Sequence, residues 1–441
     1  MNTEKQSVFR RWYGSRLVVV LESILIGAVA GLVVSGFRYL LSQADALRRW
    51  IYGAFLLGSA FWTGVWAGLL VITGLFLGWT IKVRPMIKGS GIPQVKGLLL
   101  DQLQMRWATE LPLKIITGAL GLGAGLSLGR EGPSIQVGSY VGMGLLSVFR
   151  RPKDEAKILI VAASAAGISA AFSAPLSGIL FALEELVPSF SPLFIASALG
   201  ASMAADAVAG LFFGATPVFD FAHITVLSFS NIHWVILLGI SCALLGDVFK
   251  RALYLSQDFY EKIRIPPLFR PILPLLVSIP LGFLCMDALG GGHNLIESLS
   301  MEGRPFPTLL IIFGVKLVFT ALCYGSGTSG GIFLPLLACG ALLGGAMGES
   351  LAAMGFITHE QTLNFMILGM AAFFTGVVKA PLTGIVLIFE MSGNFNHMGN
   401  LVLVCLTTFV LSDLIASRPV YTVLLERMLK GAAHHDKPAP H

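Results

Sequence analysis

"APLSGILFALEEL" (residues 174–186) returns with few changes as "APLTGIVLIFEMS" (residues 380–392), an offset of 206 residues at which Ala, Pro, Leu, Gly, Ile and one Glu coincide. Further matches follow in the same order along the chain at offsets of 202 and 212 residues. They pair Gly89 with Gly291, Lys114 with Lys316, Pro133 with Pro335, Gly138 with Gly340, Gly142 with Gly344, Gly27 with Gly239, Phe37 with Phe249 and Arg38 with Lys250. Collinear matches with a slowly drifting offset are typical of a duplicated unit, so the sequence predicts two structural repeats of about 200 residues each.

The chain is apolar along its whole length. Of its 441 residues 55% are hydrophobic and 12% are charged, and runs long enough to cross a bilayer recur from end to end. We therefore predict an all-α, polytopic membrane protein, because helices satisfy their own backbone hydrogen bonds in lipid. Several spans are too short for a hydrocarbon core of about 30 Å or contain Gly and Pro, which predicts tilted and broken helices. The candidate spans are residues 17–41, 53–79, 109–128, 135–148, 158–183, 193–214, 233–249, 271–289, 307–324, 331–354, 363–391 and 400–416.

Charge and composition at the two ends suggest the topology. Arg10, Arg11 and Arg16 precede the first span, which favours a cytoplasmic N-terminus. That span is long and lacks a small-residue cleavage site, so no cleavable signal is expected. The last residues, "KGAAHHDKPAPH", predict a flexible tail. The chain is thus divided into a cytoplasmic N-terminal segment (1–16), a first membrane repeat (17–215), a second membrane repeat (216–430) and a flexible C-terminal tail (431–441).

Other classes of site are not indicated. The net charge of +6 comes from scattered basic residues without interleaved aromatics, so no nucleic-acid partner is expected. Cysteines occur only in apolar segments, with no CxxC pair and no nearby His, and are interpreted as small buried hydrophobes. The sequence therefore predicts neither a metal site nor a cofactor. The cysteines are Cys242, Cys285, Cys323, Cys339 and Cys405.

Three glycine-rich breaks precede apolar runs: "GSGIP" (89–93), "GREGP" (129–133) and "GGIFLP" (330–335). Glycine lets the backbone approach a ligand closely, and proline is tolerated in the first turn of a helix. Helix N-termini attract anions. Any one break alone could be a tight membrane turn. All three, spread over two repeats, predict an anion site near the midplane where broken helices meet.

A nucleotide-binding loop is a further possibility, since "GLGAG" and "GLSLG" fall within residues 121–129. No GxGxxG register fits, however, and no Lys-Ser or Lys-Thr follows. Spaced glycines in an apolar run are more typical of close helix packing, so a nucleotide site is rejected.

The pair Arg130–Glu131 interrupts the apolar stretch "LSLGREGPSIQVG" (126–138). An ionisable group at membrane depth costs at least about 2.5–3.5 kcal/mol on insertion scales, so it normally lines a pathway or pairs with a partner. The Glu131 carboxylate at a helix start can itself occupy an anion site and leave it on protonation. The alternative is that Glu131 simply neutralises Arg130 in a buried pair.

Two further carboxylates, Glu184 and Glu185, end the first copy of the duplicated stretch. Successive helical residues point about 100° apart, so at most one faces a given pathway. Glu184 matches Glu390 in the second repeat, whereas Glu185 matches Met391. We therefore interpret Glu184 as structural and Glu185 as functional. The alternative for Glu185 is a charge in interfacial water.

Other matches suggest how the repeats have specialised. An offset of 202 places Phe333 opposite Glu131 and Gly292 opposite Ser90. One repeat would then supply a gate and a hydroxyl, and the other a bulky wall and amides. The matched lysines Lys114 and Lys316 are predicted to snorkel or to cap helices.

The three motifs, together with the tyrosine of "RPVYT" (418–422), resemble the chloride channel and transporter (CLC) family over about residues 20–425. The resemblance implies a homodimer in the lipid bilayer, two inverted repeats per subunit and one ion pathway per subunit. It also implies that the hydroxyls of Ser90 and Tyr421 and the amides of Ile332 and Phe333 bind chloride. Helix-end support would come from Gly89, Gly91, Arg130, Gly132 and Gly331.

The resemblance further implies that Glu131 is the gate and Glu185 an internal proton acceptor, at a position where channel members commonly carry a nonacidic residue. We therefore expect a secondary active transporter that exchanges chloride for protons and also passes bromide and nitrate. The alternative is a passive voltage- or pH-gated chloride channel. A hydrolase using both glutamates lacks a nucleophile or a metal-ligand set, so no enzyme is expected.

The expected location is the plasma membrane, which is the inner membrane in a Gram-negative bacterium. The chain ends soon after the tyrosine, so no nucleotide-binding regulatory module is expected.

Overall fold

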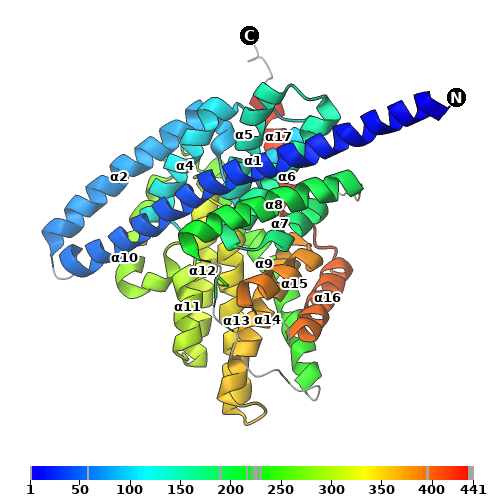
Figure 1. Ribbon diagram of the computed structural model, residues 1–441. Coiled ribbons are helices and arrows are strands. Elements are labelled where there is room, and N and C mark those ends of the chain that lie inside the picture. Colours follow the sequence, from blue (N-terminus) through cyan, green and yellow to red (C-terminus); the bar gives the residue numbers. More distant parts are fainter. Residues whose placement is uncertain are drawn as a thin grey trace.

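The computed structural model describes residues 2–56, 59–187, 191–214, 217–219, 221, 227, 231–393 and 397–435, with side chains outside 2–15, 55–56 and 432–435. Its regular elements are helices, which form one bundle (Figure 1). The α-helices are α1 (Asn2–Ile51), α2 (Ala60–Val83), α3 (Ile92–Leu99), α4 (Trp107–Gly123), α5 (Glu131–Phe149), α6 (Lys153–Phe172), α7 (Pro175–Phe181), α8 (Pro192–Phe213), α9 (Ile232–Lys262), α10 (Ile272–Leu284), α11 (His293–Met301), α12 (Phe306–Gly325), α13 (Phe333–Ala353), α14 (Thr362–Val378), α15 (Pro381–Ser392), α16 (Met398–Leu414) and α17 (Val420–His435). Short helical turns are η1 (Tyr52–Leu56), η2 (Pro85–Ile87), η3 (Ala182–Leu186), η5 (Met286–Ala288) and η6 (His359–Gln361).

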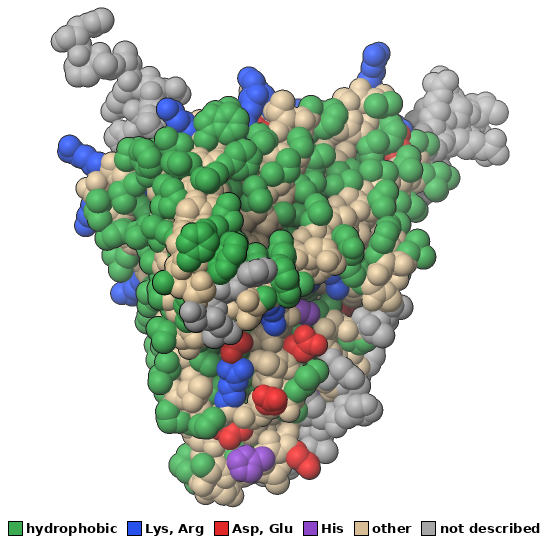
Figure 2. Space-filling view, turned by 90° about the vertical axis from the view of Figure 1, so that its left-hand side faces the viewer, with side chains coloured by type: hydrophobic (Ala, Val, Ile, Leu, Met, Phe, Trp, Pro, Cys, Tyr) green, Lys and Arg blue, Asp and Glu red, His purple; other side chains and the backbone are tan. Residues whose placement is uncertain are grey.

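Membrane crossing is supported by helix length and composition. Within the described residues, eight helices are long and apolar enough to span a bilayer, and α10, α15 and α16 are shorter apolar helices. Figure 2 shows hydrophobic side chains over much of one face, with a group of acidic and basic side chains in its lower half and further Lys and Arg side chains along its upper edge. The predicted all-α polytopic architecture is therefore confirmed.

Two predicted spans are wrong as continuous helices. Residues 158–183 divide into α6 and α7, and residues 363–391 divide into α14 and α15. Each break has a left-handed residue, Ser173 (φ 52°) or Lys379 (φ 69°), two positions before the proline that starts the next helix. Proline lacks the N–H that would continue the preceding helix, so these Ala-Pro pairs are helix starts. The breaks fall at equivalent positions of the two repeats.

Helices extend into both predicted end segments. The first helix, α1, begins at Asn2, so no helix end separates residues 1–16 from the first span. At the other end α17 continues to His435, into the segment predicted as a flexible tail. The side chains of Arg10 and Arg11 lie outside the described residues, as do residues 436–441 and the predicted repeat boundary at 215–216.

The two repeats meet through equivalent residues. Gly129 and Gly331 form an isolated antiparallel bridge, in which the Gly129 N–H donates to the Gly331 carbonyl (2.6 Å) and the Gly331 N–H donates to the Gly129 carbonyl (2.7 Å). Such reciprocal bonding between equivalent positions is the mark of a twofold relation. The two helices that follow this bridge lie on opposite sides: α5 is in the upper half and α13 in the lower half of Figure 1, as expected for inverted repeats.

The matched lysines are fully buried and cap the short turns η2 and η5. The Lys114 ammonium donates to the carbonyls of Ile87 (2.9 Å) and Gly89 (2.7 Å). In the same way Lys316 donates to Ala288 (3.1 Å) and Gly290 (2.7 Å). Of the two predicted roles, capping is the one observed, because a fully buried ammonium does not snorkel to water.

These bonds correct the predicted register of the glycine turns. Positive φ angles occur at Gly89 and Gly91 in the first repeat and at Gly290 and Gly292 in the second. Ser90 is therefore equivalent to Gly291, and not to Gly292 as predicted. The second repeat has one more residue between turn and lysine, and its three consecutive glycines hide this insertion from sequence comparison.

Close helix packing explains other matched glycines. A Cβ at Gly344 of α13 would lie 1.9 Å from the carbonyl oxygen of Phe365 in α14, and a Cβ at Gly138 of α5 would lie 2.2 Å from that of Ala163 in α6. In each repeat the paired helices approach so closely that no side chain fits between them. This contact fixes the direction in which α5 and α13 leave the centre.

Candidate ion-binding centre

The three predicted breaks converge at one place, and each is followed directly by a helix. "GSGIP" contains the start of α3, "GREGP" the start of α5, and "GGIFLP" the start of α13. A Cβ at Gly331 would lie 3.1 Å from the Gly132 nitrogen, and a Cβ at Gly132 would lie 2.8 Å from the Ser90 Cβ. The three motifs therefore pack backbone against backbone, with the N-termini of α5 and α13 joined by the Gly129–Gly331 bridge.

Glycine is required at the turn before α3. Gly89 (φ 63°) and Gly91 (φ 90°) adopt left-handed conformations that side chains disfavour. A Cβ at Gly91 would also lie 2.4 Å from the Gln136 amide oxygen. This turn holds Ser90 between the two glycines, fully buried against α5.

Glu131 is the first residue of α5 and is fully buried. Its carboxylate lies toward the amide of Leu334 in the first turn of α13, and its Oε2 is 2.4 Å from where a Gly129 Cβ would be. Neither carboxylate oxygen has a hydrogen-bond partner of standard geometry among the described residues. The carboxylate thus occupies the positive ends of two helices, where an anion is favoured.

Arg130 does not form a tight pair with Glu131. Its Nε lies 3.8 Å from the Glu131 Oε1, longer than a hydrogen bond, and is itself a buried nitrogen without a partner in the described structure. The two groups form a long ion pair, without the direct hydrogen bond of a tight neutralising pair. Arg130 instead contributes positive potential close to the carboxylate.

Two buried hydroxyls lie at neighbouring helix starts. The Ser90 Oγ accepts a long hydrogen bond from the Ile92 N–H (3.4 Å). The fully buried Tyr421, in the first turn of α17, has a hydroxyl without a hydrogen-bond partner among the described residues. Buried polar groups are normally hydrogen-bonded, so this hydroxyl is a donor available within the centre.

Phe333, the first residue of α13, belongs to an aromatic group beside these hydroxyls. Its ring centroid is 4.6 Å from that of Phe374, 5.1 Å from that of Phe172 and 6.0 Å from that of Phe181. Phe181 in turn meets Tyr421 edge to face at 6.3 Å. With Ile332 as the fully buried N-cap of α13, the second repeat supplies the bulky wall that the repeat comparison predicts.

Glu185 lies on η3, and 4% of its side chain is exposed. Its Oε1 accepts a hydrogen bond from the Lys96 ammonium (2.8 Å), which also donates to the Thr422 Oγ1 (3.0 Å). The burial argues against the alternative of a charge in interfacial water. Sequence reasoning missed Lys96, since a single lysine six residues after Ser90 carries no pattern.

The neighbouring Glu184 has a different environment. It accepts hydrogen bonds from the N–H groups of Leu382 (3.0 Å) and Thr383 (2.7 Å) at the start of α15, and from the Thr383 hydroxyl (2.6 Å). The equivalent Glu390 accepts from the same three kinds of group at the start of α7, those of Leu176 and Ser177. Each repeat caps a helix of the other, so the predicted structural role of Glu184 is confirmed.

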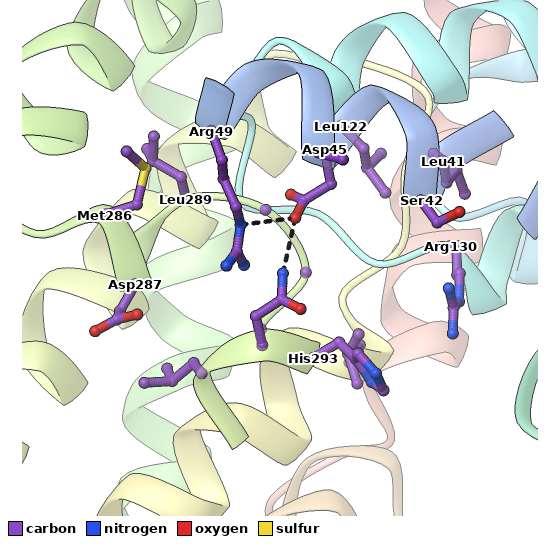
Figure 3. A pocket seen from close by; sticks show the side chains of 17 residues that line it. Leu41, Ser42, Asp45, Arg49, Leu122, Arg130, Met286, Asp287, Leu289 and His293 are labelled. Carbon is purple, nitrogen blue, oxygen red and sulfur yellow. Dashed lines mark hydrogen bonds and ion pairs between the residues drawn. The ribbon is translucent and has the colours of Figure 1, made fainter. Parts of the chain in front are cut away.

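A cavity of about 350 Å³ reaches the centre from one side (Figure 3). Arg130 and Leu334 line it, together with residues at the end of α1 and the start of α11. On its wall the Asp45 carboxylate accepts hydrogen bonds from Arg49 (3.1 Å) and Asn294 (2.7 Å). Sequence analysis missed these residues because they lie beyond the predicted first span.

The fold and the centre define the class: a membrane protein of two intertwined repeats, in which helix starts from both repeats converge around a buried carboxylate. A family model described as voltage gated chloride channel matches residues 73–413. The chain therefore belongs to the CLC family, and the resemblance drawn from its motifs is confirmed.

Individual relatives are similar over nearly the whole chain. A protein of Salmonella paratyphi B named H(+)/Cl(-) exchange transporter ClcA is 34% identical over 428 residues, covering 94% of this chain and 89% of that protein. A protein of the same name from Citrobacter koseri is 33% identical over 429 residues, with the same coverage. A crystal structure described as a slow cyanobacterial Cl-/H+ antiporter is 29% identical, with a TM-score of 0.88, covering 93% of this chain and 98% of that one.

Proposed function

We propose that this protein is a proton-coupled chloride antiporter, a secondary active transporter that exchanges small monovalent anions for protons. The observation that carries the proposal is the Glu131 carboxylate, buried at the joined starts of α5 and α13 without a fully formed hydrogen bond. Relatives named as H(+)/Cl(-) exchange transporters, which match 94% of the chain, support it.

Glu131 is the gate in this proposal. An ionised carboxylate and a chloride ion compete for the same helix-end amides, because both are attracted by the positive ends of the two helices. A protonated carboxyl loses that attraction, and chloride then takes its place. Arg130 and the adjoining cavity give the displaced group a route toward solvent on one side. Ion entry is thereby linked to proton uptake at a single position.

Chloride is held by groups that surround this position. The hydroxyls of Ser90 and Tyr421 donate to it, and the backbone amides of Ile332 and Phe333 complete the site. The unpartnered Tyr421 hydroxyl supports this assignment, since it has a donor to offer. The glycines at 89, 91, 132 and 331 support the site by allowing the backbones to meet. Chloride, bromide and nitrate fit the small size and single charge that such a site accepts.

Glu185 is the internal proton acceptor, separate from the gate at Glu131. Its carboxylate is buried but ion-paired, so it can exchange a proton without being stranded in the membrane. Tyr421 adjoins Thr422, whose hydroxyl accepts a hydrogen bond from the same Lys96 ammonium as the Glu185 carboxylate, which supports a proton route past the tyrosine. A proton taken up at Glu185 is passed toward Glu131, where it releases the gate.

The proposal includes a homodimer with one ion pathway per subunit. The subunit lies in the plasma membrane, the inner membrane in a Gram-negative bacterium, with its N-terminus in the cytoplasm. Membership of the CLC family supports the dimer, and Arg16 at the start of the first candidate span supports the orientation.

The test is proton movement into proteoliposomes driven by a chloride gradient. The wild-type protein should move protons uphill, which a passive channel cannot do. Glu131→Gln and Glu185→Gln should each abolish proton movement while chloride continues to pass. Glu184→Gln is the matched control, because this adjacent carboxylate caps α15 and should leave the ratio of protons to chloride unchanged. Normal proton pumping by either of the first two variants would refute the role of that residue.

A further inference from the structure

Lys96 joins three parts of the centre through one ammonium group. It lies on α3, which follows the turn that holds Ser90. It donates to the Glu185 carboxylate on η3 (2.8 Å) and to the Thr422 hydroxyl on α17 (3.0 Å), next to Tyr421. Its side chain is 18% exposed, against 4% for Glu185, so the pair is shielded from water mainly on the carboxylate side.

Among the described residues, few charged or titratable groups face Glu185. They are Lys96 from α3, the neighbouring Glu184 on η3 and the Tyr421 hydroxyl of α17. Glu184 is engaged by the amides of α15, and its negative charge opposes ionisation of Glu185. Among the described residues, Lys96 is thus the cation in contact with Glu185, and it acts against burial and the like charge, which both favour the protonated carboxyl.

We infer that Lys96 is a positioning residue for proton transfer, which keeps the Glu185 carboxylate in place, favours its ionised form and thereby sets the pH range over which Glu185 takes up protons. This inference rests on the proposed function, because it assigns a partner to the proposed proton acceptor. Protonation of Glu185 removes the charge that Lys96 binds, whereas the bond to Thr422 is unaffected. The lysine stays tied to α17 while the carboxyl is released to hand on its proton.

A merely structural lysine would behave differently. Lys96 would then serve to hold α3 against α17, where Leu425 packs close to Gly97. Its loss would loosen the helices that carry Ser90 and Tyr421, so chloride and proton turnover would fall together at every pH. If Lys96 instead acts on the ionisation of Glu185, its loss should change the pH dependence of proton turnover.

The experiment compares Lys96→Gln and Lys96→Arg with wild type in the proteoliposome assay, at several values of pH set equal on both faces. An opposite charge at this distance typically displaces a carboxyl titration by about one unit or more. In Lys96→Gln, the pH at which proton turnover is half-maximal should rise by about that amount. Lys96→Arg should restore the wild-type profile. Thr422→Val should leave the profile unchanged, because Lys96 keeps its contact with Glu185.

Lys157→Gln is the matched control. Its ammonium also lies 2.8 Å from a carboxylate, that of Asp101, but on the exposed surface. Hydrogen bonds from Lys157 and Lys153 hold the pKa of Asp101 below its ordinary value. The Lys157–Asp101 pair therefore has the same length as the Lys96–Glu185 pair but lies outside the proposed pathway. This variant should transport as wild type does.

The outcomes separate the inference from the proposed function. If wild type moves no protons, the proposed function fails. If wild type pumps and Lys96→Gln keeps the wild-type pH profile, or loses chloride and proton turnover in equal proportion, the inference alone is overturned. Should Lys96→Gln fail to fold, Glu185→Asp withdraws the carboxylate from the lysine and should raise the half-maximal pH in the same way.

Discussion

Removing the carboxylate that caps a helix of the opposite repeat, by Glu390→Ala or Glu184→Ala, should destabilise the protein by the same amount in either case. Each carboxylate accepts two backbone N–H groups and one hydroxyl. After truncation the hydroxyl can rotate to another acceptor, but the two amides of the first helical turn cannot. At about 1 kcal/mol for each stranded amide, either variant loses about 2 kcal/mol. The Gln variants keep one acceptor oxygen and should lose about half of this.

The assay is reversible unfolding in mixed micelles of a mild detergent and SDS, which yields the free energy of unfolding of each variant. The ratio of protons to chloride measured on the same samples should stay at the wild-type value, since neither carboxylate touches the ion centre. The reasoning is refuted if either Ala variant lies within about 0.5 kcal/mol of wild type, the range of an ordinary surface substitution. A large difference between the two would contradict the twofold relation.

Two further expectations concern matched residues of the repeats. Gly344→Ala should prevent folding or severely destabilise the protein, because the added Cβ would lie 1.9 Å from a carbonyl oxygen of α14. Gly314→Ala, with no atom within 4 Å of the added Cβ, should be neutral or slightly stabilising. Expression level and thermal unfolding of the two variants test this difference. Lys114→Met and Lys316→Met each leave two buried carbonyls without a donor and should lower the free energy of unfolding by about 1–3 kcal/mol. Chloride binding measured by calorimetry should weaken only in Lys114→Met, because Lys114 caps the turn that holds Ser90.

Much of the fold could be predicted because the relevant signals are local. Apolar runs identify the spans, and glycine followed by proline identifies the helix starts that build the centre. The Ala-Pro breaks before α7 and α15 were missed, because hydropathy continues across them. The one-residue shift at Gly290 was missed because consecutive glycines align equally well in several registers.

In the candidate site, too, local signals could be recognised in the sequence and long-range contacts could not. Glu131 stood out as a charge in an apolar run, and comparison of the repeats separated Glu185 from Glu184. Lys96 could not be found in this way, because its partners Glu185 and Thr422 are distant along the chain, and the contact of Asp45 with Asn294 is equally remote in sequence. Long-range pairing leaves no periodic trace in a single sequence.

The bridge between Gly129 and Gly331 has a consequence for how this centre can change over evolutionary time. At the point shared by both halves the contact is made by main chain alone, and a methyl group at Gly129 would already collide with Glu131. Substitution can therefore alter the acids, hydroxyls and rings arranged around the axis, but not the axis itself. New ion preferences or a loss of coupling would therefore arise from exchanged side chains on an unchanged backbone.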